Sequence, residues 1–344
     1  MSTDRLTPVT EGRAMTGQAP FAQGHKNERG QRNNAKALVL CRTPFQAIMV
    51  RAIIKEENTS AYDLVYFSQN DAEEDKFYFN LLSQQAEVAQ YILITPQKFD
   101  VINYIKLYFN INAVIKNTGY AKIYLSSIDN LVFRNLAERN RGAQFISFDD
   151  GTINLMMSSP YLRERGVKAL LRRLLFRVQS IKRFIENIDL HYSAYRDFDN
   201  IMPKNIIRFI DVFGDRLVSK KSGDRKKTFF IGQPLDEFCD KGFQEKLKRY
   251  LLGFKFDYYI KHPRETVPLL DAIPILDKKG RVAEEAIFEA CSGSRPEIWG
   301  TFSTVLINID SGIADKIMIL ETDREDAAEW GKIAENARCK VVFL

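Results

Sequence analysis

The chain has 344 residues, of which 45% are hydrophobic and 27% are charged, as is typical of a soluble globular protein with two domains. Its net charge of +6 fits an acidic substrate or an anionic membrane surface, and the lack of any nucleic-acid motif argues against binding to DNA or RNA. The four cysteines are widely spaced and form no cluster with the three histidines, which argues against disulfides and against a metal site. No apolar run reaches the roughly 18 residues of a transmembrane helix, so we expect a cytoplasmic protein.

Residues 1–35 predict a disordered tail or an added leader, because they are rich in Gly, Gln, Asn, Arg, Thr and Ser and lack the apolar core of a signal peptide. His25 lies in this tail and is assigned no role. Regular structure is expected to follow directly. The run 37–41 is typical of a buried strand, and Thr43 followed by Pro44 is typical of a helix start.

Strands and helices then alternate along the chain. Strands are expected at 62–67, 90–94, 121–126 and 143–148, and helices at 47–54, 75–85, 100–113 and 130–140. This alternation predicts a parallel sheet with helices on both faces.

The segment Arg163–Arg183 holds eight basic residues and a single acid, Glu164. Apolar residues recur in it at helical spacing: Leu170, Leu171, Leu174, Leu175, Val178 and Ile181. We expect a helix whose basic face either docks on an anionic membrane or is simply solvated. A strand is expected at 191–195, and the polar stretch 220–227 is the predicted linker.

A second α/β run follows this linker. Strands are expected at 228–232, 256–260, 297–300 and 316–320, and helices at 240–252, 281–288 and 325–337. We therefore expect an N-terminal Rossmann-like domain, residues 36–225, and a C-terminal one, residues 226–344. Two doubly wound domains that face one another form the GT-B architecture of glycosyltransferases, in which the active site lies in the cleft between them.

Two carboxylates, Asp149 and Asp150, follow the predicted strand 143–148 and precede Gly151 and Thr152. The carboxyl end of a strand is the edge at which open α/β sheets bind ligands. A carboxylate that is ionised at neutral pH can act there as a general base toward an attacking hydroxyl. The alternative is an ordinary turn, for which Asp-Asp-Gly-Thr is well suited.

His262 follows the predicted strand 256–260 and lies at the equivalent edge of the second domain. An imidazole titrates near neutral pH and could protonate or hydrogen-bond a departing phosphate. Arg264 beside it offers a fork of donors that suits a phosphate group. The alternative is a structural histidine at a strand end, which is also how we interpret His191.

Several other polar residues lie near predicted strand ends or helix starts. The hydroxyls of Thr301, Ser303 and Thr304 could bind phosphate or merely cap a helix. Glu284 and Glu285 begin a predicted helix, where they could hold ribose hydroxyls or simply favour the positive end of the helix dipole. Asp236 lies on the loop after the strand 228–232, either facing the cleft or as an ordinary loop acid.

Several motifs, in this order, resemble those of glycosyltransferase family 52, the bacterial lipooligosaccharide sialyltransferases. They are Cys41–Gln46, Phe148–Leu155, Ser158–Leu162, His191-Tyr192, Gly232–Pro234, His262–Arg264, Glu297–Trp299 and Thr301–Ser303. The resemblance covers most of the chain from Leu38 onward. Asp-Asp-Gly and His-Pro are shared more widely among bacterial sialyltransferases.

The resemblance implies a GT-B-type fold and an inverting transfer of sialic acid from CMP-Neu5Ac to a terminal galactose of lipooligosaccharide, most often in α2,3 linkage. It implies no cofactor and no obligatory metal, with the acceptor on the N-terminal domain and the donor on the C-terminal one. The implied catalytic residues are Asp236, His262, Asp149 and Asp150. The implied substrate-binding residues are Gly151, Thr152, Gly232, Gln233, Pro234, Pro263, Arg264, Glu284, Glu297, Thr301, Phe302, Ser303 and Thr304.

The general base is the least defined of these roles. The family places an aspartate shortly after the Gly-x-Pro turn, but here Leu235 follows Pro234 and Asp236 comes one residue later. We favour Asp236 as the base, while other bacterial sialyltransferases use the Asp-Asp-Gly motif. Asp149 and Asp150 would otherwise organise the donor pocket.

Two alternative functions are a glycosyltransferase that uses another nucleotide sugar, such as a UDP-hexose, and a nucleotide- or glycan-binding module with a dead site. Many members of the family begin with a membrane anchor, and we expect the Arg163–Arg183 helix to replace it on the cytoplasmic face of the inner membrane. A homodimer is left open by the sequence.

Overall fold

The computed structural model describes residues 36–94, 109, 111, 115, 119–159, 164, 166–213 and 226–344. We call residues 36–213 of this set the first lobe. Its strands are β1 (Ala37–Cys41), β2 (Tyr62–Ser68), β3 (Ala86–Leu93), β4 (Lys122–Leu125), β5 (Gln144–Phe148), β6 (Leu190–Ser193) and β7 (Ile207–Phe209). They form one parallel sheet in the order β3-β2-β1-β4-β5-β6-β7. The direction of the crossovers reverses between β1 and β4, where open α/β sheets bind ligands.

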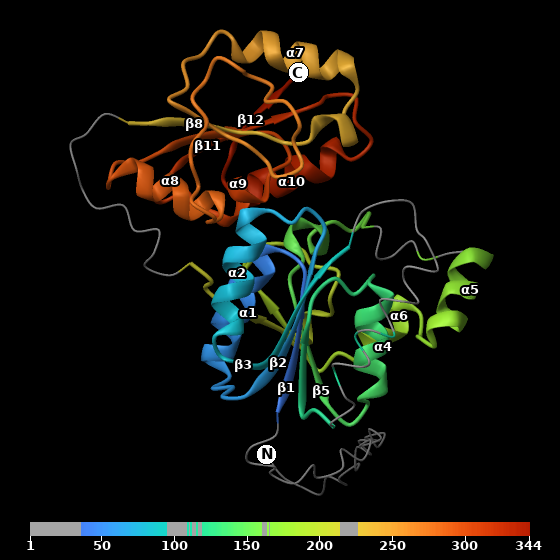
Figure 1. Cartoon of the computed structure of the whole chain (residues 1–344). Coiled ribbons are helices and arrows are strands. Elements are labelled where there is room, and N and C mark those ends of the chain that lie inside the picture. The colour runs from blue at the N-terminus through green and yellow to red at the C-terminus, as the bar shows by residue number, and fades with distance from the viewer. Residues whose placement is uncertain are drawn as a thin grey trace, which may run out of the picture. The chain divides into compact units, whose positions relative to one another are not determined.

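Helices cover both faces of this sheet (Figure 1). They are α1 (Pro44–Glu56), α2 (Glu73–Ser83), α4 (Leu131–Arg139), α5 (Val167–Phe176) and α6 (Ile181–Glu186). Val39 and Cys41 pack into a core that includes residues of α1 and α2. Leu38 and Leu40 point to the other face, into a core that includes residues of α4 and α6. Both sides of the sheet are therefore buried, as its uninterrupted apolar strands require.

The second lobe, residues 226–344, contains a smaller parallel sheet. Its strands are β8 (Thr228–Ile231), β9 (Tyr258–Ile260), β10 (Glu297–Gly300), β11 (Asp315–Leu320) and β12 (Lys340–Phe343), in the order β12-β11-β10-β8-β9. Its helices are α7 (Lys241–Leu251), α8 (Ala283–Cys291), α9 (Thr304–Asn308) and α10 (Ala327–Asn336). Figure 1 shows α7 on one side of the sheet and the other three helices on the opposite side.

Both lobes belong to one compact unit, and polar contacts join them. Tyr78 of α2 donates a hydrogen bond of 3.2 Å to Glu285 of α8. Lys278 forms an ion pair with Glu74 of α2. Tyr195 donates a hydrogen bond of 2.8 Å to Asn308 of α9. These contacts hold the carboxyl edges of the two sheets near each other.

The structure confirms the predicted fold class, which is an α/β protein of the GT-B type with two Rossmann-like sheets. Thr43 caps α1 as expected, because its hydroxyl accepts a hydrogen bond from the Gln46 backbone N–H. Most of the predicted helix at 100–113 and most of the linker at 220–227 lie outside the described residues. The proposed division into residues 36–225 and 226–344 stays a prediction.

The basic segment differs from the single helix that was expected. Helix α5 ends at Phe176, because Arg177 adopts a left-handed conformation with φ of +51°, and α6 begins only at Ile181. In the described part of the chain, no helix combines the length and the apolar character that crossing a bilayer requires.

Candidate active site

A cavity of about 610 Å³ opens between the carboxyl edges of the two sheets. The first lobe contributes residues that follow β1, β2, β4 and β5: Arg42, Thr43, Gln69, Asn70, Ser127, Asp129, Asp150, Gly151 and Thr152. The second lobe contributes Lys261, His262, Pro263, Arg264, Lys278, Glu284 and Thr304. The structure thus brings the Asp-Asp-Gly turn and the His-Pro turn to the same cavity, as the strand-end argument predicts.

Asp149 does not line this cavity, because its side chain is fully buried behind the turn. Its carboxylate accepts hydrogen bonds from Ser193 Oγ and from the Ala194 backbone N–H, both at 2.8 Å. It also pairs with His191 Nε2 at 3.0 Å and accepts a bond of 3.3 Å from Asn200. Because these donors occupy its carboxylate, we interpret Asp149 as an internal anchor that ties the end of β5 to β6 and to the loop after it.

His191, which we interpreted as a packed strand residue, is fully buried and serves this anchor. Its Nδ1 lies 2.8 Å from Ser147 Oγ. Since Nε2 faces the Asp149 carboxylate, the ring donates from Nε2 and accepts the Ser147 hydroxyl proton at Nδ1. Ser147 and His191 lie opposite each other on the neighbouring strands β5 and β6, and only the order of strands in the sheet reveals this pairing.

Asp150 does face the cavity, and it is held by one side chain that follows β4 and one from the first turn of α1. Ser127 Oγ donates a hydrogen bond of 2.8 Å to Asp150 Oδ2, and Gln46 Nε2 donates to Oδ1. Gln46 is fully buried; its Oε1 accepts a bond of 2.6 Å from the Arg42 backbone N–H. This role of Gln46 was not predicted, although a glutamine among the apolar residues of α1 is a signal that the sequence contains.

Gly151 allows the Asp150 turn to approach the second lobe. Its φ of +61° lies in the left-handed region that favours glycine. A Cβ built at this position would lie 3.3 Å from Thr304 Cγ2, at the start of α9. A side chain here would therefore strain the turn and crowd the opposite wall of the cavity.

The tautomer of His262 is set by a local hydrogen bond. Its Nδ1 accepts the Arg264 backbone N–H at 3.1 Å, which leaves Nε2 as the nitrogen that carries the proton and can meet a ligand. Burial lowers the pKa of His262 to about 4, and the positive charges of Arg264 and Lys278 act in the same direction. The imidazole is therefore neutral at pH 7 and acts as a hydrogen-bond donor. An anionic ligand would favour its protonation.

Glu265 holds the His262 turn from behind. This buried carboxylate accepts a hydrogen bond of 3.2 Å from the His262 backbone N–H and another from the Tyr259 hydroxyl. Burial raises the pKa of Glu265, and these donors oppose the shift. Gly232 packs directly against the pair, because a Cβ built on it would lie 2.6 Å from the Tyr259 ring. Glycine is thus required at the end of β8.

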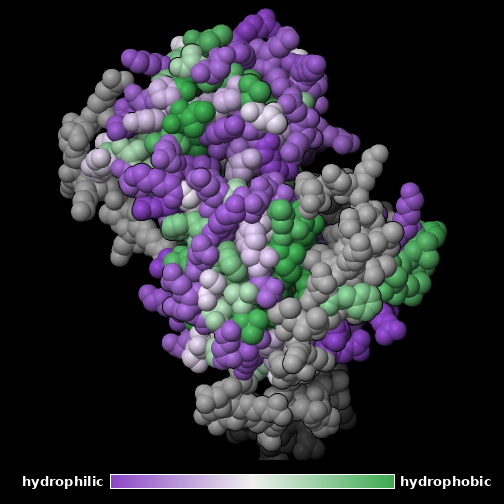
Figure 2. All heavy atoms as spheres, in the orientation of Figure 1, coloured by the Kyte–Doolittle hydropathy of each residue, from purple (hydrophilic) through white to green (hydrophobic). Residues whose placement is uncertain are grey.

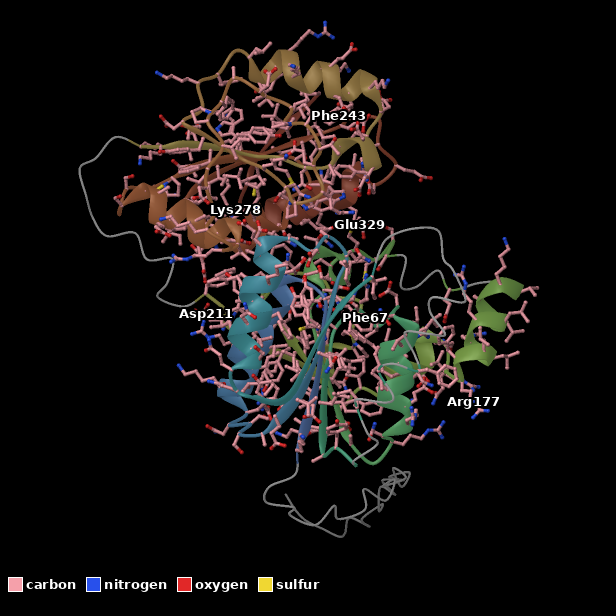
Figure 3. All side chains as sticks on the ribbon, in the orientation of Figure 1. Phe67, Arg177, Asp211, Phe243, Lys278 and Glu329 are labelled. Atoms are coloured by element: carbon pink, nitrogen blue, oxygen red, sulfur yellow. The ribbon has the colours of Figure 1, made fainter. Side chains whose placement is uncertain are left out.

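Cationic groups from both lobes line the cavity. Lys278, labelled in Figure 3, pairs with Glu74 and donates a hydrogen bond of 3.1 Å to the Lys261 carbonyl. Arg42 lies 3.9 Å from Asp129, a loose ion pair. Arg264 pairs with Glu237. Acidic side chains also line the cavity: Glu74, Asp75, Asp129, Asp150 and Glu284. A bound phosphate would therefore compete with carboxylates for these cations. Neither Arg42 nor Lys278 was assigned a role from the sequence.

The remaining predicted residues of the second lobe divide into two groups. Glu284 and Thr304 line the cavity, and burial raises the pKa of Glu284 while a 2.7 Å hydrogen bond from Asn308 opposes the shift. Ser303 is buried as the cap of α9, and Thr301 is buried with no partner for its hydroxyl among the described residues. Phe302 lies beneath the Arg324 guanidinium at 4.4 Å. Ser303, Thr301 and Phe302 therefore shape the loop after β10 and do not line the cavity.

Asp236 lies outside this cavity. With Gln233 and Pro234 it lines an adjoining pocket of about 220 Å³, to which Arg264 is common. Its carboxylate accepts a hydrogen bond of 3.2 Å from Gln244. The two aspartates that could serve as the base, Asp150 and Asp236, therefore occupy separate pockets in this structure.

Glu297 lies at the wrong edge of its sheet for the binding role expected of it. It is the first residue of β10, so its side chain lies at the amino end of the strand, opposite the edge where ligands bind. It accepts hydrogen bonds of 2.8 Å from Trp299 Nε1 and 2.7 Å from Lys226. These contacts give Glu297 a structural role.

The chain matches the profile of glycosyltransferase family 52 over residues 60–324. It is 25% identical to an N-acetyllactosaminide alpha-2,3-sialyltransferase of Haemophilus influenzae, over 83% of this chain and 92% of that protein. It is 24% identical to a CMP-N-acetylneuraminate:beta-galactoside alpha-2,3-sialyltransferase of Pasteurella multocida, over 85% of this chain and 93% of that protein.

Among solved structures, the chain resembles an alpha/beta-galactoside alpha-2,3-sialyltransferase of Photobacterium phosphoreum, with a TM-score of 0.53 and 13% identity, over 90% of this chain and 99% of that one. At this identity the likeness concerns the fold alone. The family profile, in contrast, spans well over half of the sequence. The chain therefore belongs to glycosyltransferase family 52 and is a glycosyltransferase with a GT-B-type fold.

Proposed function

We propose that this enzyme is an inverting sialyltransferase that moves sialic acid from CMP-Neu5Ac to a terminal galactose of lipooligosaccharide, in α2,3 linkage. The observation that carries the proposal is the arrangement of His262, whose protonated Nε2 is left for a ligand in a cavity that Asp150 lines from the other lobe. The names of the curated relatives supply the sugar and the linkage.

The leaving group of such a reaction is the phosphate of CMP, on which negative charge develops as the bond to the sugar breaks. His262 would donate a hydrogen bond to it from Nε2, and the charges of Lys278 and Arg42 would stabilise it electrostatically. Since the pKa of His262 is lowered to about 4 in the free protein, the neutral ring stabilises the phosphate as a hydrogen-bond donor. It can deliver a proton to the phosphate only after it has itself been protonated, and the approach of the anionic phosphate favours that protonation.

The acceptor hydroxyl needs a base on the face of the sugar opposite the phosphate. Asp150 is the candidate that shares the cavity with His262. Asp236 is the candidate that the family resemblance favours, and it lies beside Arg264 in the adjoining pocket. Both carboxylates remain candidates, and paired substitutions distinguish them.

We propose further that the reaction needs no metal ion, because the cavity already contains cationic side chains that a phosphate could meet, among them Arg42 and Lys278. The test is activity after exhaustive treatment with a chelator. Unchanged turnover supports the proposal, and restoration by added Mg²⁺ or Mn²⁺ contradicts it.

The enzyme is also proposed to work at the cytoplasmic face of the inner membrane, where a glycolipid acceptor would be found. The basic residues between Lys168 and Arg183 support this location through attraction to anionic lipid. It is independent of the donor and acceptor chemistry and is tested separately.

The donor is tested by incubating the protein with CMP-Neu5Ac, UDP-glucose or UDP-galactose, each with and without lactose, and measuring nucleotide release. Release of CMP alone, stimulated by lactose, supports the proposal. Release of UDP would instead favour a hexosyltransferase of the same fold. The anomeric configuration and linkage of the sialyl-lactose product, read by NMR, test inversion and the α2,3 linkage.

A further inference from the structure

Helix α5 turns an apolar face toward solvent. Its side chains Val167, Leu170, Leu171, Leu174 and Leu175 are between 47% and 71% exposed. At 100° per residue these five positions occupy one continuous arc of about 140° around the helix. Figure 2 shows the corresponding hydrophobic patch where Figure 1 draws α5. An outward apolar face of this kind marks an interaction surface.

The opposite side of α5 is fixed to the first lobe. Phe176 is buried, and its carbonyl accepts a hydrogen bond of 2.7 Å from Asn135 of α4. Arg173 lies 3.7 Å from Glu164, which also pairs with the buried Arg134 of α4 at 3.1 Å. These contacts fix the side of α5 that is opposite its exposed leucines.

Basic side chains flank the apolar arc. Lys168 and Arg172 lie at its margin within α5, and Arg177, labelled in Figure 3, follows at the end of the helix. Lys182 and Arg183 continue the series in α6, and all five residues are exposed. Leucines bordered by lysine and arginine form the pattern of a helix that lies in the interface of an anionic bilayer.

A second copy of this chain fits the surface less well than a membrane does. A stable dimer buries about 20–30 residues on each side, whereas a ten-residue helix is only about 15 Å long. Helix α5 contains no acidic residue, so contact between two α5 helices would bring no opposite charge to their basic margins. An anionic bilayer offers acyl chains to the leucines and negatively charged headgroups to the cations.

We propose that α5 is an interfacial membrane helix, which inserts its valine and four leucines among the acyl chains of an anionic bilayer while its basic margin contacts the headgroups. This goes beyond the electrostatic docking expected of the basic residues, because apolar insertion supplies part of the affinity. It does not depend on which sugar the enzyme transfers.

The test is sedimentation of the purified protein with vesicles of phosphatidylglycerol and phosphatidylcholine, or of phosphatidylcholine alone. We expect binding to the anionic vesicles that weakens but persists at high salt. The double variant Leu171→Gln/Leu174→Gln should lower the partition coefficient at least tenfold, the scale of removing two partly buried leucines. The matched control is Leu252→Gln at the end of α7, where the side chain is 69% exposed, and it should bind like the parent protein.

Lys168→Gln/Arg172→Gln should weaken binding to anionic vesicles and leave the weak binding to phosphatidylcholine unchanged. Turnover of a soluble disaccharide should be the same in every variant, which shows that each is folded. Undiminished vesicle binding by the double leucine variant would overturn the proposal. A second result would also overturn it. In this result the parent protein does not bind vesicles but forms a dimer in analytical ultracentrifugation, and the double leucine variant is monomeric.

Discussion

The turn at Asp149–Asp150 in the first lobe and the turn at His262–Glu265 in the second lobe follow the same plan. In each, a candidate catalytic side chain, Asp150 or His262, lines the cavity, and a buried carboxylate lies behind it. They differ in how the buried carboxylate is held. Asp149 is tied by four donors to the neighbouring strand and loop, whereas Glu265 is tied to its own turn and to Tyr259.

Each turn thus combines a residue that can touch substrate with a buried residue that holds its neighbours in place. A substitution of the residue that lines the cavity should change turnover with little effect on stability. A substitution of the buried carboxylate should first lower the free energy of unfolding.

The largest effect is expected from removing the base. Asp150→Asn and Asp236→Asn each keep the shape of the side chain and abolish its basicity. The variant that removes the base should lose about 10³-fold in kcat, and the other at most about tenfold. A large loss in Asp150→Asn would give each lobe one catalytic group, and a large loss in Asp236→Asn would give both groups to the second lobe. Neither aspartate is the base if both variants keep a tenth of the activity.

The next effect concerns the His262 turn. His262→Ala should lower kcat with CMP-Neu5Ac by about 10²-fold, because the departing phosphate loses its donor. His262→Asn keeps a side-chain N–H and should lose less. Turnover of His262→Ala close to that of the parent enzyme would remove the residue from the mechanism.

The anchor of the first turn should be tested by its stability. Asp149→Asn leaves buried donors without their charged acceptor, so the free energy of unfolding should fall by about 2–4 kcal/mol in urea titrations. The matched control is Asp236→Asn at an exposed position, with an expected change of no more than about 0.5 kcal/mol. Equal stability of the two variants would contradict the anchoring role of Asp149.

The smallest effect is the pH dependence that His262 adds to stability. Its pKa is lowered from 6.5 to about 4 in the folded protein, so above pH 6.5 the ring is neutral in both states and its contribution is fully present. As the pH falls from about 6.5 to about 4, the unfolded chain takes up the proton first, and the stability decreases. His262→Gln should flatten this part of the curve of unfolding free energy against pH. An unchanged slope would show that His262 is not desolvated in solution.

The sequence alone located the two turns, because each follows an apolar strand and parallel strands place their carboxyl ends at one edge of a sheet. It also determined the two α/β runs and the Thr43 cap. It could not separate Asp149 from Asp150, since the separation depends on donors from β6 and α1 that are distant in the chain. For the same reason the roles of Gln46 and Lys278 were missed. The role of Glu265 was missed although its partners His262 and Tyr259 are close in the chain. The family resemblance implied a substrate-binding role for Glu297, although this residue starts its strand and so lies at the edge opposite the ligand edge.

The leucine stripe of α5 shows most clearly what only the tertiary structure decided. Apolar residues at helical spacing reveal that one face of a helix is apolar, but not what lies against it. Val178 and Ile181 of the same predicted stripe are buried, whereas Leu171 and Leu174 are exposed, because the chain turns at Arg177 between them. Local periodicity is a property of the sequence, and burial is a property of the neighbours that the fold supplies.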